Sequence, residues 1–436
     1  MDLIFLLFCL FLYFKGNKSF SITGFLALST NYFRLGSKHD SLFFKHDVQY
    51  SAILFVIIVF SVEFYKHNKF RYAKKEVKKL LKIFTLFLLI SISVDILSNG
   101  TSIFDVFTSL KTWLLLLSFY IFSRLKLEEL HRILMLICII TSIHVFIFYF
   151  QYFTGIVIVD TKIIEEDFSS GNYTRMGYPP YYTYLLILIL LSDIFKLKPI
   201  FKYLVLLLAF ATSLVSLTRS MTAAFIIGIL TCNFLKTPSS LFKYLLVGVI
   251  LLFMTPIIVS NFPILTERFG EGYSDFSNSF ANIDASSQEG TFHYRLLHMI
   301  ERVVYISEDF TRSIFGVGFV HEKNYTADPF TFGIYKEEYN AISQLGTADI
   351  SWSGLFLRLG FVGVAIYLLF FRYFIKLFYS FKNFPVARVG FAYIFISLFI
   401  LSFSSSRIAF GTFWPLIFIF YYYLQKQLII NKTTQH

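Results

Sequence analysis

The sequence predicts an all-α fold, namely a polytopic membrane bundle of about twelve transmembrane helices with one large helical extracytoplasmic loop. Of its 436 residues, 56% are hydrophobic and only 15% are charged, whereas a soluble domain has roughly 45–50% apolar and about 25% charged residues. The apolar residues gather in long runs, and the net charge of +12 lies mostly between them. Charge placed in this way indicates membrane topology, and no nucleic acid partner is expected.

The apolar runs define the expected helices. Several have nearer 16 than 20 residues, so their boundaries are soft. The segment 19–33 is marginal, which leaves twelve or thirteen spans open. The expected spans are 1–14, 48–65, 80–97, 104–123, 130–153, 180–195, 201–217, 220–235, 241–259, 351–371, 389–404 and 408–424.

Lys and Arg in the short loops predict the orientation, because such loops are basic on the cytoplasmic side. The segment 66–82 carries eight Lys or Arg against one Glu, so we expect it to face the cytoplasm. Alternation from this segment onward places every later basic loop inside. It places the acidic or short loops outside, at 98–103, 154–179, 218–219, 260–350 and 404–407.

The loop 260–350 divides the chain into an N-terminal membrane part at 1–259, the loop itself, and C-terminal spans with a short tail at 351–436. It holds 13 Asp or Glu against six Lys or Arg. Its segment 292–306 has Leu296, Ile300 and Val303 on one helical face, while Arg295, His298 and Arg302 lie on another. We therefore expect an amphipathic helix along the membrane surface.

Four arginines face outward in this topology, where the positive-inside rule makes them uncommon. They are Arg175, Arg219, Arg295 and Arg407; Arg219 and Arg407 lie in tight turns between spans. Arginine suits phosphate because its planar fork donates paired hydrogen bonds and stays charged. A lipid-linked pyrophosphate would fit such a set, although each arginine alone is equally well explained by a local acid or a lipid headgroup.

Asp349 precedes the span 351–371 and is a candidate general base, with His298 as the alternative. Asp349 alone is better explained as a helix N-cap, and most loop histidines are merely solvated. The chain carries no nucleotide-binding or metalloprotease motif and no metal-ligand spacing, so no metal or cofactor is expected.

Several short motifs follow one another in order over residues 170–365. They are Arg175-Met176-Gly177 followed by Pro179-Pro180, Thr218-Arg219-Ser220-Met221, the helix bearing Arg295 and Arg302, Gly316-Val317-Gly318, Ala348-Asp349, and Gly360 with Gly363. Each motif is weak alone, but the ordered set is moderately specific and resembles the O-antigen polymerase (Wzy-type) and ligase superfamily. The first 150 residues match this superfamily only as generic spans.

The resemblance implies a GT-C-like glycosyltransferase in the bacterial inner membrane that polymerises undecaprenyl-diphosphate-linked oligosaccharide units at the periplasmic face. It assigns Arg219 and Arg295 to the diphosphate, with Arg175 and Arg407 as helpers, and Asp349, His298 and Arg295 to catalysis. It also implies membrane lipid and a chain-length regulator protein as partners.

Two other functions stay open. The ligase branch usually has a histidine before the returning span, where this chain has Asp349, which favours the polymerase branch. A flippase or transporter of lipid-linked oligosaccharide usually has short loops and a repeated half, so the long loop and the absence of a repeat count against it.

Overall fold

The computed structural model describes residues 2–32, 49–66, 74–159, 163–168, 171–177, 179–216, 218–237, 292–320, 330, 332, 334–336, 341–343 and 350–433. The expected span 241–259 and Asp349 lie outside these residues. The helices of the first half are α1 (Asp2–Phe14), α2 (Lys18–Ser29), α3 (Gln49–Lys66), α4 (Lys75–Asn99), α5 (Ile103–Leu110), η1 (Lys111–Leu117), α6 (Ser118–Phe122) and α7 (Leu127–Thr154).

The second half is also mainly helical, with short 3-10 turns near its end. Its helices are α8 (Thr183–Leu191), α9 (Pro199–Val215), α10 (Arg219–Lys236), α13 (Phe292–Ser307), α14 (Phe310–Phe315), α15 (Ser351–Ser380), α16 (Pro385–Phe399), η3 (Leu401–Phe403), η4 (Arg407–Ala409), η5 (Gly411–Phe413) and α17 (Trp414–Thr433).

The prediction of a helical membrane protein is confirmed in its general form. Within the described ranges, six helices are long and apolar enough to cross a membrane: Gln49–Lys66, Lys75–Leu97, Ile103–Phe122, Leu127–Thr154, Ser351–Ser380 and Pro385–Phe403. The helices Asp2–Phe14 and Pro199–Val215 are apolar but shorter. The count of twelve or thirteen spans stays a prediction.

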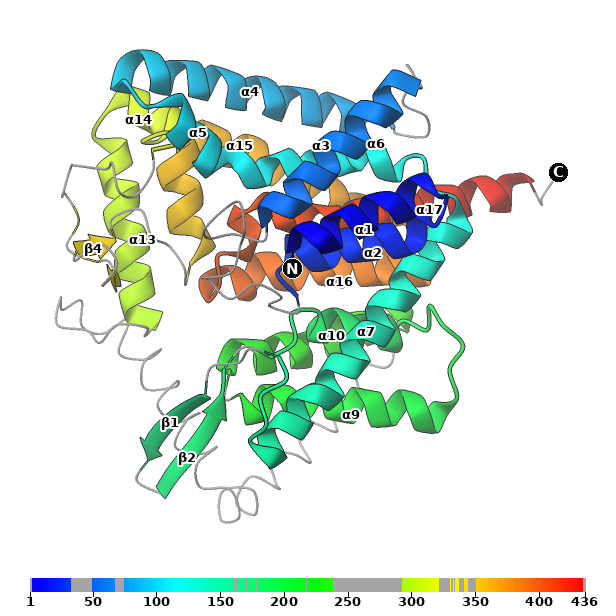
Figure 1. Cartoon of the computed structure of the whole chain (residues 1–436). Coiled ribbons are helices and arrows are strands. Elements are labelled where there is room, and N and C mark those ends of the chain that lie inside the picture. Colours follow the sequence, from blue (N-terminus) through cyan, green and yellow to red (C-terminus); the bar gives the residue numbers. More distant parts are fainter. Residues whose placement is uncertain are drawn as a thin grey trace.

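The structure adds strands that an all-α fold does not contain. β1 (Ile163–Phe168) pairs antiparallel with β2 (Gly171–Met176), and β3 (Ile334–Lys336) pairs antiparallel with β4 (Ala341–Ser343). Both pairs are short hairpins within segments that the charge alternation assigns to the outside. Figure 1 shows them at the same end of the bundle as α13, and the chain's C-terminus at the opposite end.

The centre of the bundle is α17, in which every residue from Trp414 to Gln425 is buried. Helix α8 is also enclosed, with Thr183–Leu190 buried. A helix that is apolar and covered all round belongs in the interior. The outer helices α3 and α4 bury only about a third of their apolar stretches inside the protein, as expected for helices that meet lipid rather than water.

The two ends of the bundle differ in charge. At one end, Asp193 forms ion pairs with Lys202 at 2.5 Å and Lys236 at 2.7 Å, which joins the ends of α8, α9 and α10. Nearby, the Lys74 ammonium lies 5.7 Å from the Phe381 ring in the turn between α15 and α16. We call this the basic end. The opposite end, with α13 and both hairpins, is the loop end (Figure 1).

Helix α15 bends sharply at Gly360, whose φ of 61° and ψ of −174° break the helical geometry. The segment after α14 packs against this bend, where the Val317 amide donates a hydrogen bond to the Leu357 carbonyl at 2.7 Å. A Cβ on Gly360 would lie 2.6 Å from the carbonyl carbon of Ile314, so no larger residue fits there without displacing the backbone. Residues 351–359 therefore form a separate first arm of α15, which packs against α13.

Candidate functional site

Helix α13 lies across the loop end and docks on the first arm of α15 (Figure 1). It buries the face that carries His298 and Arg302, while Ile300 is 43% exposed. The amphipathic helix is thus present, and the side turned toward the protein carries His298 and Arg302 together with the apolar residues Tyr294, Leu297 and Ile306. Buried polar groups of this kind require partners, and the structure supplies them for His298 and for the two terminal nitrogens of Arg302.

His298 is held against the start of α15. Its Nδ1 lies 3.0 Å from the Ser353 Oγ, and the two side chains are 3% and 0% exposed. A histidine within hydrogen-bond reach of a hydroxyl is an arrangement that general bases use. Here the pair is enclosed between two helices, so in this conformation it fixes α13 on α15 and does not face a substrate.

Arg302 is completely buried one turn further along α13. Its guanidinium pairs with Glu301 at 2.7 Å, donates to the Phe332 carbonyl, and lies 4.2 Å from the Phe330 ring centroid. The same Glu301 carboxylate accepts from the Phe332 amide at 3.1 Å. This cluster attaches the returning part of the loop to α13. Arg295 lies two turns before Arg302 on the same side of the helix and is half-buried.

The segment Gly316-Val317-Gly318 is explained by a contact with α4. The Asp95 carboxylate accepts from the Phe319 amide and from the Thr101 hydroxyl, both at 2.8 Å. Gly318 has a φ of 82°, and a Cβ there would lie 2.5 Å from the Asp95 Cγ. Glycine is required because the backbone must approach this carboxylate closely. Sequence reasoning did not single out Asp95, although an acid inside an apolar run is the signal that would have found it.

Arg407 lies on a set of stacked tyrosines. Its guanidinium carbon is 4.1 Å from the Tyr181 ring centroid and 5.6 Å from that of Tyr184. Tyr184 in turn stacks on Tyr393, with centroids 5.2 Å apart. Burial alone lowers the pKa of Arg407, but the neighbouring tyrosines outweigh burial and raise the pKa above its ordinary value. The guanidinium therefore remains charged, as an anion site requires.

The turn bearing Arg407 is joined to α15. The Ser351 hydroxyl donates to the Ser405 carbonyl at 2.6 Å, and the Trp352 indole donates to the Ser402 hydroxyl at 3.0 Å. The first arm of α15 therefore contacts α13 on one side and the turn 401–409 on another. These contacts form a continuous path from His298 to Arg407 and on to Tyr181.

Arg219 and Arg175 lie on neighbouring elements. Arg219 is the first residue of α10, which packs beside α16 and η3. A cation at a helix N-terminus opposes the helix dipole, so an anion nearby would offset its cost. Arg175 is on β2, paired with Ile164 of β1. The chain reaches Tyr181 six residues later.

The structure thus connects His298 and Arg407 through α15, and it places Arg175, Arg219 and Arg295 on elements of the same end. No cluster of three His, Cys, Asp or Glu side chains suited to a metal occurs in the part of the chain that the structure describes. No protein-family model matches the chain, and no curated protein matches it either.

Proposed function

We propose that this protein is a membrane glycosyltransferase that polymerises lipid-diphosphate-linked oligosaccharide units into a surface polysaccharide. The observation that carries the proposal is the charged Arg407 on its tyrosine platform, 4.1 Å from Tyr181, in a turn joined through α15 to α13. The proposal further takes the fold to be GT-C-like with about twelve spans, in a bacterial inner membrane, with the loop end facing the periplasm.

The reaction joins two lipid-linked units. A sugar hydroxyl of the accepting unit attacks the anomeric carbon of the growing chain, and the bond from that carbon to the diphosphate oxygen breaks. The lipid diphosphate leaves with the electron pair, and the hydroxyl proton passes to a base. Arg219, Arg295 and Arg407, with Arg175 as a helper, stabilise the charge that develops on the leaving diphosphate, which requires no metal.

The base is assigned to Asp349, with His298 as the alternative. The enclosed contact between His298 and Ser353 favours Asp349, because a histidine covered by α15 must move before it reaches a substrate. Arg295 and His298 would then share α13, so that docking of this helix sets both the charge and the shape of the site.

The proposal is tested in a strain whose surface polysaccharide gives a visible ladder on gels. Arg407→Ala and Arg219→Ala are each expected to leave a single capped repeat unit, with the protein still present in the membrane. The matched control is Arg132→Ala, an exposed arginine at the start of α7, which is expected to keep the full ladder.

Other outcomes separate the alternatives. Loss of all surface chains on gene deletion would indicate a ligase, and units trapped on the cytoplasmic side would indicate a flippase. Full ladders from both Arg407→Ala and Arg219→Ala would show that the arginine site is wrong.

A further inference from the structure

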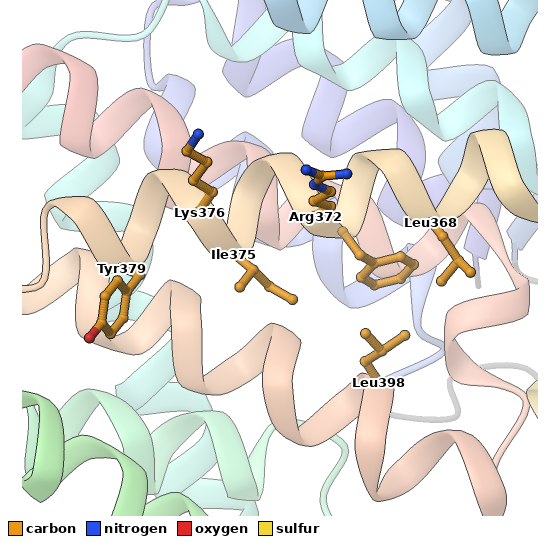
Figure 2. Close-up of a pocket in the computed structure, with 7 residues that line it drawn as sticks. Leu368, Arg372, Ile375, Lys376, Tyr379 and Leu398 are labelled. Carbon is orange, nitrogen blue, oxygen red and sulfur yellow. The ribbon is translucent and has the colours of Figure 1, made fainter.

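A groove between α15 and α16 lies away from the loop-end residues. It has a volume of about 410 Å³, and four of the residues that line it are apolar: Leu368, Phe371, Ile375 and Leu398. Figure 2 shows Leu398 of α16 pointing toward α15, with Ile375 and Leu368 on the facing side. A cavity of this size falls in the range of small-molecule sites.

The groove runs along the bundle toward the basic end. From Leu368 to Tyr379 it follows α15 for about 16 Å, the rise of eleven helical residues. This is about half of the ~30 Å hydrocarbon thickness, so the groove matches the depth of one leaflet. Tyr379 marks its end beside the turn to α16, where the Lys382 ammonium lies 4.8 Å from the Tyr379 ring.

Two cations border the middle of the groove, between Leu368 and Tyr379. Arg372 and Lys376 are one turn apart on α15, both are exposed, and in Figure 2 both rise from the edge of α15 opposite Leu398. Among the described residues, no acidic side chain lies within ion-pair distance of either. Cations beside hydrocarbon are costly without a counter-charge, and basic pockets between membrane helices bind acidic lipid headgroups.

We propose that this groove binds an anionic glycerophospholipid from the leaflet at the basic end. One acyl chain lies along Leu368, Phe371, Ile375 and Leu398, and the phosphate sits between Arg372 and Lys376. Tyr379 lies three residues beyond Lys376 at the end of the groove, on the side toward which the rest of the polar headgroup extends. This site is independent of the proposed glycosyltransferase activity, because none of the proposed catalytic or diphosphate-binding residues lines the groove.

The test uses the full chain purified in a neutral detergent. Native mass spectrometry measures the dissociation constants of phosphatidylglycerol and of phosphatidylcholine with identical acyl chains. We expect phosphatidylglycerol to bind more tightly. The double variant Arg372→Gln/Lys376→Gln should bind it about 25-fold more weakly, since each cation near a lipid phosphate contributes roughly fivefold. Leu368→Trp, which fills the groove without changing charge, should also weaken binding.

The matched control is Lys79→Gln/Lys82→Gln on α4, which removes two exposed cations from the same end but away from the groove. It should bind phosphatidylglycerol as the wild type does. The proposal is overturned if the two double variants lose affinity equally, if phosphatidylcholine binds as tightly as phosphatidylglycerol, or if Leu368→Trp changes nothing. Displacement of the lipid by soluble glycerol phosphate would also overturn it, because the acyl chain would then contribute nothing.

Discussion

Replacing Asp95 with alanine should release the segment after α14 from α4. Asp95 is 1% exposed and accepts two hydrogen bonds of 2.8 Å, from the Phe319 amide and the Thr101 hydroxyl. Hydrogen bonds to a carboxylate contribute about 1.5–3 kcal/mol each, so the loss of both costs at least about 3 kcal/mol. Because Phe319 is fully buried, its amide has no water to replace the lost partner.

Hydrogen–deuterium exchange of the purified full chain measures this release. A cost of about 3 kcal/mol raises the exchange rate of the peptide containing residues 316–320 by about a hundredfold or more. Asp95→Asn should give an intermediate rate, because its amide keeps one acceptor oxygen. Asp193→Ala, at the basic end, should leave this peptide unchanged. If Asp95→Ala exchanges at the wild-type rate, the carboxylate does not hold the segment and the explanation of Gly318 fails.

Two further predictions concern the ends of the bundle. Arg302→Ala, which leaves Glu301 without its buried partner, should destabilise the docked loop by about 3–5 kcal/mol. Arg302→Lys should restore little of this because lysine lacks the planar fork; an unchanged unfolding midpoint in detergent would contradict this account. At the basic end, partial burial raises the pKa of Asp193, but hydrogen bonds from Lys202 and Lys236 outweigh it and hold the pKa below its ordinary value. Asp193→Asn should therefore lower the thermal midpoint slightly relative to the wild type at neutral pH. The difference between the two midpoints should shrink as the pH falls below about 4. An equal difference at neutral pH and below about pH 4 would rule out a stabilising role of the ion pairs.

Hydrophobic runs predicted most helices because lipid and buried faces impose the same requirement on a whole segment. The expected span 130–153 is α7, Leu127–Thr154, and 351–371 begins the longer α15. Other spans differ. The run 180–195 gives only the nine residues of α8, whereas the run 104–123 matches the continuous helical stretch Ile103–Phe122, in which the 3-10 turn η1 joins α5 to α6. Apolarity sets where a chain is buried, but it does not distinguish one unbroken helix from several short ones.

For the candidate site, too, the sequence predicted local properties, whereas contacts between distant residues came from the structure. Charge alternation predicts that Arg219, Arg295 and Arg407 face outward, since topology depends on charge in local segments. It could not show that Arg407 lies on Tyr181, more than two hundred residues earlier in the chain. The spacing in 292–306 predicted an amphipathic helix along the membrane surface, but it could not show which residues contact that helix. Tertiary packing turned His298 and Arg302 inward, because Ser353, Glu301 and the 330–332 segment satisfy their polar groups.

The sequence by itself determined that this protein is helical, that much of it meets lipid, and which loops carry positive charge. These properties follow from the composition of single segments and from the spacing of apolar and charged residues along them. Only the tertiary structure decided that Asp95 anchors Gly318, that Gly360 bends α15 into two arms, and that a groove opens between α15 and α16. Each of these depends on contacts between residues far apart in the chain, and no local pattern encodes such contacts.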